Sequence, residues 1–472
     1  MLPFPMVRLR NKRFRRQGDR SIQSSNPFSL SPMMGFPFEI FMLVLEQACG
    51  TYFQTMKEFI DMRSLVMTVC AFWHDVVLEH GQFWSQYHIM PGKRYVDILD
   101  WTSHFNNRLV DLTVHLDSTP LPLLAAGSSR ASNGGRLTLL ETAVEAARHA
   151  GRCDRLHVTA HEVTALPTFL DGIRHSDGSD LEALSIGRIV SQDPNAVAFH
   201  TLAHPIFGSY LPRLRFIRLL AFVLSWNDLF YYPEAVYLVF HQVMESFMIP
   251  TWKQLEAVLL SAPNLRRLSL RHFACGPLVG SARAVVLPNV VELDMCFCGD
   301  NLAAFMAGCV LPSLTTYTAT FSHPGDIVQL LWCKDLLANV TSFTLSGRCD
   351  RLPDIVAMFR SLPMMEHVNL SDAGPSFIEA LTPGKAHNYT LLCPLLREVS
   401  LCDCPLLLIA DFVWFRKVLG SPIDLLEIHD LPDYDLRVET WIGENVGYMS
   451  MDPPYDFRDA WIWHNENYSA IE

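Results

Sequence analysis

The stretches of sequence that decide the fold lie between residues 263 and 370 and share one pattern. They are PNLRRLSL (263–270), PNVVELDM (288–295), PSLTTYTA (312–319), ANVTSFTL (338–345) and PMMEHVNL (363–370). Each contains an apolar residue, two spacers, a second apolar residue, one spacer and a third apolar residue. The first apolar positions follow one another at steps of 25, 24, 26 and 25 residues. The last two apolar positions are two residues apart, so they point to one face of a short strand.

A proline strengthens the pattern, because it stands two residues before the first apolar position in six of the eleven units that fit the template. Proline is 29 of the 472 residues, so fewer than one would be expected at that offset by chance. Proline cannot donate a ladder hydrogen bond and is typical just before a strand. The six prolines are Pro212, Pro263, Pro288, Pro312, Pro363 and Pro394. The eleven units begin at Leu109, Cys153, Leu181, Leu214, Leu265, Val290, Leu314, Val340, Met365, Leu396 and Ile423.

The segments between the strands, such as residues 300–309, 326–337 and 354–362, predict helices on the outer side of the strands. A period near 25 residues lies within the range typical of leucine-rich repeats. One unit cannot bury its own apolar edge, and stacking with its neighbours does. We therefore predict an α/β fold in which residues 91–432 form a curved leucine-rich repeat solenoid with insertions.

Two intervals and the C-terminal region depart from this period. The first interval begins at Leu109, is 44 residues long and contains a polar loop at 127–135. The second interval begins at Leu214, is 51 residues long and contains the aromatic-rich segment 226–252, for which we predict helix. Residues 433–472 are acidic and aromatic, with nine Asp or Glu against two Arg. They are predicted to cap the last repeat or to form an exposed docking tail.

The bulk composition limits the class of protein. Hydrophobic residues make up 50% of the chain and charged residues 18%, which is enough for a large core and too apolar for a disordered protein. The net charge of −12 disfavours general nucleic-acid binding. No apolar run of membrane-spanning length and no signal-peptide pattern is present, so we expect no membrane partner and an intracellular location, in cytoplasm or nucleus. In that compartment the twelve cysteines are expected to be free thiols.

The N-terminal residues 1–31 are predicted to be a disordered basic arm. Seven Lys or Arg stand in the first twenty residues against one Asp. The arm is either a solvated tail or, at residues 8–16, a nuclear-import patch.

Motifs that carry catalysis are missing from the sequence. It contains no Gly-rich phosphate loop, no Gly-x-Ser-x-Gly turn and no His-Glu-x-x-His helix. We therefore expect no enzyme activity, no catalytic residue, no cofactor and no metal. A zinc site would need four convergent ligands at a suitable spacing, so a structural role is favoured for the pairs Cys296/Cys298 and Cys402/Cys404, with an accidental redox pair as the other alternative to a metal site. Cys298 and Cys404 fall three residues after the last strand position of their units, where a small side chain packs or bonds to the backbone.

A short apolar region precedes the repeats. Pro37 suits the first turn of a helix that continues through Ile40 and Leu43. A second helix carries Leu65 and Val69 on one stripe at i, i+4 spacing. These residues predict a small helical module.

Residues 36–89 resemble an F-box, the helical module that docks on the Skp-type adaptor of cullin–RING ubiquitin ligases. The resemblance rests on Phe36-Pro37-Phe38-Glu39-Ile40, on Leu65, Val69-Cys70, Phe72-Trp73 and Val76, and on Phe83-Trp84. It implies an F-box-like module at 32–90 followed by leucine-rich repeats, as in fungal F-box-like proteins. The implied adaptor-binding residues are Phe36, Pro37, Ile40, Leu43, Leu65, Val69, Cys70, Trp73 and Val76. The alternative is that this helical unit only caps the N-terminal end of the solenoid.

The resemblance implies a substrate-recognition subunit of a cullin–RING ligase. The module would bind the adaptor and through it the cullin, and the repeats would bind a protein substrate whose contact residues the sequence does not identify. The alternative is a leucine-rich repeat scaffold for protein interactions with no ligase role.

Overall fold

The computed structural model describes much of the chain between Gln86 and Met451. The described residues are 86–89, 109–116, 138–151, 153–160, 165–174, 178–188, 211–221, 233–243, 249–276, 284–296, 308–320, 334–371, 374–382, 390–430 and 435–451, with 176, 207, 298, 305 and 327. The chain divides into two compact units, 1–79 and 80–472, and all described residues belong to the second. The predicted basic arm (1–31) and all but residues 86–89 of the predicted helical module (32–90) lie outside the described residues.

The second unit is a mixed α/β structure built on one large parallel sheet. Fourteen strands form this sheet, and each pairs with the next strand of the sheet along the chain. They are β1 (Gln86–Ile89), β2 (Leu109–Leu116), β3 (Cys153–Ala160), β4 (Ala183–Arg188), β5 (Phe216–Leu220), β6 (Tyr237–Val243), β7 (Arg267–Phe273), β9 (Glu292–Cys296), β11 (Thr316–Thr320), β12 (Ser342–Ser346), β13 (His367–Ser371), β14 (Glu398–Cys402), β15 (Leu425–His429) and β16 (Tyr448–Met451). A separate short pair consists of β8 (Val285–Val286) and β10 (Cys309–Val310).

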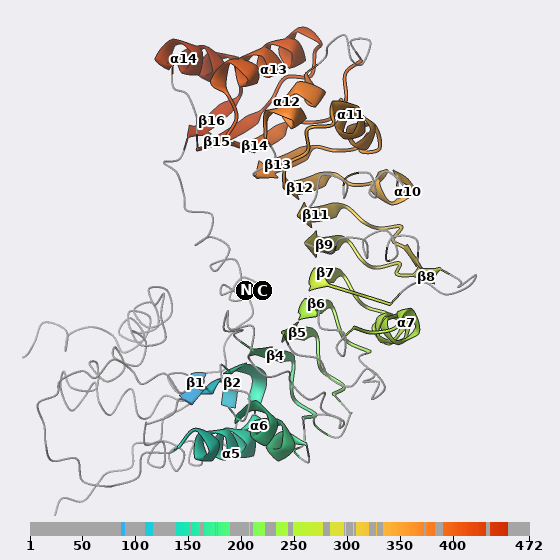
Figure 1. Cartoon of the computed structure of the whole chain (residues 1–472), viewed down its shortest axis with the longest axis vertical. Helices are drawn as coiled ribbons and strands as arrows, with labels where there is room; N and C mark the ends of the chain where they lie inside the picture. The colour runs from blue at the N-terminus through green and yellow to red at the C-terminus, as the bar shows by residue number, and fades with distance from the viewer. Residues whose placement is uncertain are drawn as a thin grey trace, which may run out of the picture. The chain divides into compact units, whose positions relative to one another are not determined.

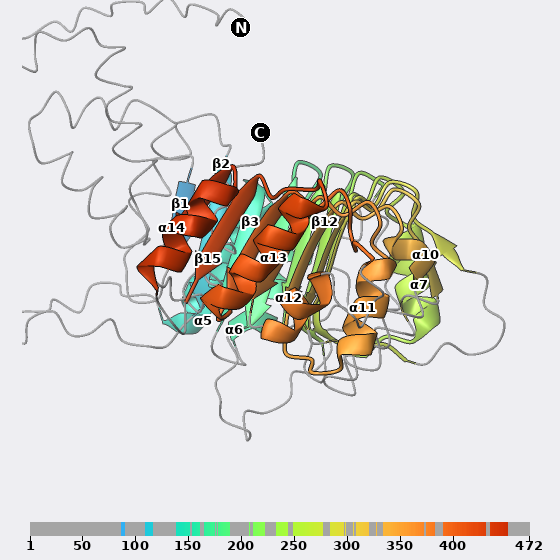
Figure 2. The same ribbon diagram turned by 90° about the horizontal axis from the view of Figure 1, so that it is seen from above.

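The helices cover one face of the sheet, and the sheet curves with that face outward (Figure 1 and Figure 2). Thr138 and Thr251 begin two of these helices through capping boxes with Glu141 and Gln254. The helices are α5 (Leu139–Ala150), α6 (Ala165–Ile173), α7 (Trp252–Leu260), α10 (Lys334–Leu337), α11 (Leu352–Arg360), α12 (Pro375–Leu381), α13 (Leu406–Val418) and α14 (Leu436–Asn445).

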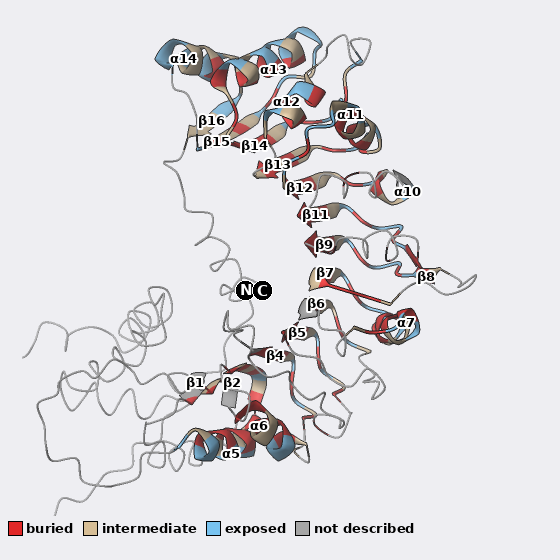
Figure 3. Ribbon diagram, in the orientation of Figure 1, coloured by how far each residue is buried: buried red, intermediate tan, exposed pale blue. Residues whose placement is uncertain are grey.

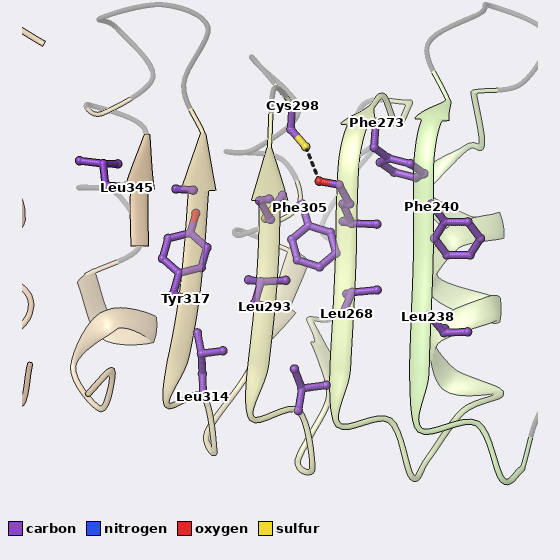
Figure 4. Packing of buried hydrophobic residues seen from close by; sticks show 14 of the residues in the cluster. Leu238, Phe240, Leu268, Phe273, Leu293, Cys298, Phe305, Leu314, Tyr317 and Leu345 are labelled. Atoms are coloured by element: carbon purple, nitrogen blue, oxygen red, sulfur yellow. Dashed lines mark hydrogen bonds between the residues drawn. The ribbon is translucent and has the colours of Figure 1, made fainter. Parts of the chain in front are cut away.

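The core consists of two rows of apolar side chains that run across the sheet beneath the helices. In all eleven predicted units, the second and third template positions are buried. Leu268 lies beside Leu293, and Leu293 beside Tyr317, because these residues are register partners on successive strands (Figure 4). The template therefore predicted eleven of the fourteen strands and the side of each that faces the core.

The prediction of helix across residues 226–252 was wrong, because this segment contains strand β6. The unit follows the template as Pro233-x-Ala235-x-x-Leu238-x-Phe240, and all three apolar residues are buried. Its first apolar position is an alanine, which makes the unit inconspicuous among large aromatic residues. Its strand pairs with β5 on one side and β7 on the other.

The C-terminal region begins with one more helix and strand. Helix α14 starts after Asp435, whose carboxylate accepts hydrogen bonds from the backbone N–H groups of Arg437 and Val438. Strand β16 pairs in parallel with β15 and adds to the sheet. Residues 452–472 of the predicted cap or tail lie outside the described residues.

Side chains that follow the prolines join neighbouring units. The amide of Asn264 donates to the carbonyl oxygen of Pro233 at 2.9 Å, and that of Asn289 donates to Pro263 O at 3.0 Å. The Ser313 hydroxyl donates to Pro288 O at 2.6 Å. Each of these proline carbonyls thus accepts from the next unit, and we call this set of bonds the Asn/Ser–Pro ladder.

A buried arginine fixes the turn before β14. Arg416 of α13 is fully buried and donates to the carbonyl oxygens of Leu392, Cys393 and Leu396 at 3.0–3.1 Å. It also donates to the Ser421 hydroxyl at 2.7 Å. Burial lowers the pKa of Arg416 to about 10. The guanidinium supplies donors that these buried carbonyls need.

We expect Asn289→Ala to lower the free energy of unfolding by about 0.5–1 kcal/mol, because it removes one inter-unit hydrogen bond of the Asn/Ser–Pro ladder. Urea unfolding followed by circular dichroism measures the change. Asn369→Ala is the matched control: Asn369 lies on a strand but bonds within its own unit, to Ser371. Equal losses in the two variants would contradict the role of the ladder.

We expect Arg416→Leu to cost at least about 3 kcal/mol of unfolding free energy, because it removes hydrogen bonds to three buried carbonyl oxygens. Arg416→Lys should lose most of the same stability, since an ammonium cannot reproduce the planar fork. Thermal melts test both variants against Lys417→Leu, which alters an exposed neighbour and should change the melting temperature little.

Candidate functional site

The face of the sheet opposite the helices is the candidate site, and we call it the concave strand face. Alternate residues of strands β2 to β15 point away from the buried rows. Most of them are partly exposed, and Figure 3 shows the ribbon coloured by burial. They form three rows across the sheet. The first is Asp111, Arg155, Ala183, Phe216, Tyr237, Arg267, Glu292, Thr316, Ser342, His367, Glu398, Leu425; the second is Thr113, His157, Ser185, Arg218, Val239, Ser269, Asp294, Thr318, Thr344, Asn369, Ser400, Glu427; the third is His115, Thr159, Gly187, Leu220, His241, Arg271, Cys296, Thr320, Ser346, Ser371, Cys402, His429.

One backbone feature ends the face at the same register in several strands. Ala221, His272, Asp403 and Asp430 have positive φ angles of 46–55°, and Gly347 has a φ of 123°. Each of these residues directly follows the third-row residue of its strand. The left-handed conformation turns the chain at the end of the strand, except that β7 continues for one more residue, to Phe273, which pairs with Val243. Other strands have a positive φ at the same register, so the positive φ of His272 is a feature of the repeated fold.

Ion pairs connect first-row residues of neighbouring strands. Arg267 binds Glu292 at 2.6 Å, and its guanidinium also lies 4.8 Å from the centre of the Tyr237 ring. His367 lies 2.7 Å from Glu398. Both pairs lie between register partners, so the parallel ladder itself brings Arg267 beside Glu292 and His367 beside Glu398.

Several arginine and histidine side chains lie on the strands from β3 to β7. We define the basic cluster as His157, Arg218, His241, Arg271 and His272. The rings of His241 and His272 stack with their centres 5.6 Å apart. Arg271 binds Asp294 of the next strand at 2.6 Å.

Burial within this cluster keeps its histidines neutral. Burial, with the positive charge of Arg218 and the nearby His115, lowers the pKa of His157 to about 4. Burial, with His272, Arg271 and Arg218, lowers the pKa of His241 to about 4. Burial and Arg271 also lower the pKa of His272. At neutral pH the three imidazoles are therefore hydrogen-bonding groups beside two guanidinium ions.

Beyond β9 the concave strand face changes in character. Its residues on β11 and β12 all carry hydroxyl groups: Thr316, Thr318, Thr320, Ser342, Thr344 and Ser346. Glutamates return on the last strands, with Glu398 and Glu427. The face therefore runs from a basic, aromatic segment through a hydroxyl-rich segment to an acidic segment.

The cysteine pairs have structural roles. The thiol of Cys298 donates to the carbonyl oxygen of Leu270 at 3.3 Å (Figure 4), which is the backbone contact expected for its slot. Burial raises the pKa of Cys404 to about 12. Burial and Asp294 raise the pKa of Cys296 well above its usual value. Neutral thiols of this kind are poor nucleophiles and poor metal ligands.

The implied adaptor-binding residues, from Phe36 to Val76, all lie outside the described residues. The concave strand face, in contrast, was not assigned residue by residue from the sequence. Its residues are the spacers of the template, and only the strand register brings distant spacers together. These residues could have been found by comparing the spacers that occupy the same template position in successive units.

Within the described stretches, no group of three or more His, Cys, Asp or Glu side chains is arranged to hold a metal ion. No helix among the described residues is both long and apolar enough to cross a bilayer. No protein-family model matches the chain, and comparison with curated proteins finds no match.

The lowered histidine pKa values predict how stability depends on pH. His157 and His241 bind protons less readily in the folded chain than in the unfolded chain. Stability should therefore be lost as the pH falls from about 6.5 towards 4, because the unfolded state takes up more protons there. Between pH 7 and pH 5 we expect a loss of roughly 2 kcal/mol from the pair, after allowance for solvent screening of the two partly exposed rings, measured by urea unfolding.

The variant His157→Gln with His241→Gln should flatten this pH dependence, because glutamine does not titrate. The groups that face the two histidines, His115, Arg218, Arg271, His272 and Asp294, remain in both proteins. A pH profile as steep in the variant as in the parent protein would assign the acid sensitivity to other groups.

Proposed function

We propose that the second unit is a leucine-rich repeat solenoid that binds a protein on its concave strand face. The observation that carries this proposal is the face itself: a curved set of mostly partly exposed side chains from many strands, while the apolar core of the fold lies on the other side of the sheet. Solenoids of stacked repeats present such surfaces to protein partners. The mixture of Arg, Tyr, Phe and hydroxyl side chains suits a partner surface with both apolar and polar groups.

We further propose that this receptor works inside the cell, in the cytoplasm or nucleus, as the substrate-recognition subunit of a cullin–RING ubiquitin ligase. The support for this step is the F-box resemblance of residues 36–89 in the sequence. The box would bind the Skp-type adaptor and the repeats would hold the substrate. The chain would then act by positioning, while the transfer of ubiquitin occurs on its partners. A protein-interaction scaffold without an adaptor is the competing function.

Co-purification with a Skp-type adaptor tests the ligase role. We expect the full chain to bind the adaptor and the variant Val69→Asp with Trp73→Ala to lose it, because a charge and a cavity replace two apolar contacts of the box. The matched control is Val418→Asp with Trp414→Ala, which changes the same residue types at exposed positions of α13. Adaptor binding that survives the first variant, with the chain still folded, favours the scaffold.

Substrate binding is tested separately on the concave strand face. Thr318→Arg with Thr344→Arg places two bulky charges at register partners in the hydroxyl-rich segment. We expect this variant to keep the adaptor and to lose the proteins captured by the full chain, as compared by quantitative mass spectrometry. An unchanged set of captured proteins would mean that the partner binds elsewhere.

A further inference from the structure

We propose that the basic cluster binds an anionic side chain, a carboxylate or a phosphoryl group, of the protein segment that lies on the concave strand face. This inference rests on the proposed role of that face as a protein-binding surface. It adds the chemistry of the partner and the place where that chemistry is recognised.

The strand register places three members of the cluster, His157, Arg218 and His241, on strands β3, β5 and β6 of the concave strand face. His157 and Arg218 occupy the second row on β3 and β5, with Ser185 between them on β4. Strands lie about 4.8 Å apart, so the two backbones are separated by about 10 Å. That separation leaves room for a carboxylate or phosphoryl group between an imidazole and a guanidinium. His241 stands in the third row of the neighbouring strand β6, two residues beyond Val239, the register partner of Arg218, and Arg218 is close enough to lower its pKa.

The charges that act on the cluster histidines have one sign. Every charged or ionisable group of the described chain that shifts the pKa of His157 or His241 is an arginine or another histidine. Bound negative charge would relieve this crowding and favour the protonated imidazoles. Arg218 and His272 also make contacts within the protein, but a guanidinium has five N–H donors and can serve a ligand as well.

Carboxylates limit the cluster on both sides. Asp111 on β2 lies 3.7 Å from Arg155, and Asp294 on β9 binds Arg271. A long polyanion that crossed the sheet would meet these carboxylates, and the whole chain has a net charge of −12. The arrangement therefore suits one or two adjacent anionic groups on a protein segment better than a nucleic acid.

Apolar groups beside the cluster provide contacts for the rest of such a segment. The rings of Phe216 and Tyr237 lie 4.8 Å apart on β5 and β6, in the first row. Leu220 lies in the third row and covers Gly187, where an added Cβ would lie only 3.3 Å from the Leu220 Cβ. An acidic residue with an apolar neighbour would thus meet both kinds of contact, which is typical of energetically important interface sites.

Peptide binding to the full chain tests the proposal. The probes are three fluorescein-labelled peptides of one Ala/Leu sequence with glutamate, phosphoserine or glutamine at the same two central positions, compared by fluorescence anisotropy. We expect the glutamate or the phosphoserine peptide to bind at least about tenfold more tightly than the glutamine peptide, as for charge-assisted hydrogen bonds. The difference between the first two identifies the anion. Binding should tighten from pH 7 to pH 5, because the anion stabilises the protonated histidines.

Arg218→Gln should remove most of that preference, and Arg218→Lys should keep part of it. The matched control is Arg213→Gln, in the turn before the same strand, where the exposed arginine pairs with Asp180. It should change affinity less than about twofold. Circular dichroism and melting temperature establish that each variant is folded.

Three outcomes would overturn the proposal: equal binding of all three peptides, equal loss in the Arg213 and Arg218 variants, or displacement of the peptide by an oligothymidine that binds more tightly through Arg218. The last outcome would assign the cluster to nucleic acid. If the peptides fail but the Thr318/Thr344 variant still loses the captured proteins, the proposed function stands and only the anion site falls. If the anionic peptides bind but the Thr318/Thr344 variant still captures the same proteins, the anion site stands and the proposed function falls.

Discussion

The structure depends on the parallel pairing of each strand with the strand of the next unit. A single unit buries its two apolar residues only when a neighbour supplies the adjacent part of the same row. The backbone ladder sets the register, and the register aligns Leu268 with Leu293 and Leu293 with Tyr317. The Asn/Ser–Pro ladder adds side-chain bonds before strands β7, β9 and β11. Stability is therefore shared between neighbouring units along the chain.

The same register creates the concave strand face. Residues that are distant in the sequence become neighbours because they occupy equal places in successive units. The pairing of Arg267 with Glu292 and the gathering of His157, Arg218 and His241 both follow from this rule. Burial lowers the pKa values of His157 and His241, so both side chains stay neutral beside the positively charged arginines.

The apolar template made the sheet predictable from sequence, and its limits explain what was missed. Proline before the strand and two apolar residues at spacing two identified eleven strands and their buried side. The unit at Ala235 was missed although it fits the template, because the aromatic-rich residues around it were interpreted as helix. The Asn or Ser after the proline was also missed, since one polar residue in a turn has many explanations until its acceptor is known. The basic cluster could not be predicted without the register, because its members are spacers in units of unequal length.

The alternation of buried and concave residues has a consequence for the evolution of this protein. Substitutions in the buried rows change the stability of two adjoining units, whereas substitutions in the spacers leave the pairing of strands intact. Partner preference can therefore diverge through single spacer changes while the scaffold persists. Related chains that recognise different partners would share the leucines, prolines and turn residues and differ at alternate positions of the same strands.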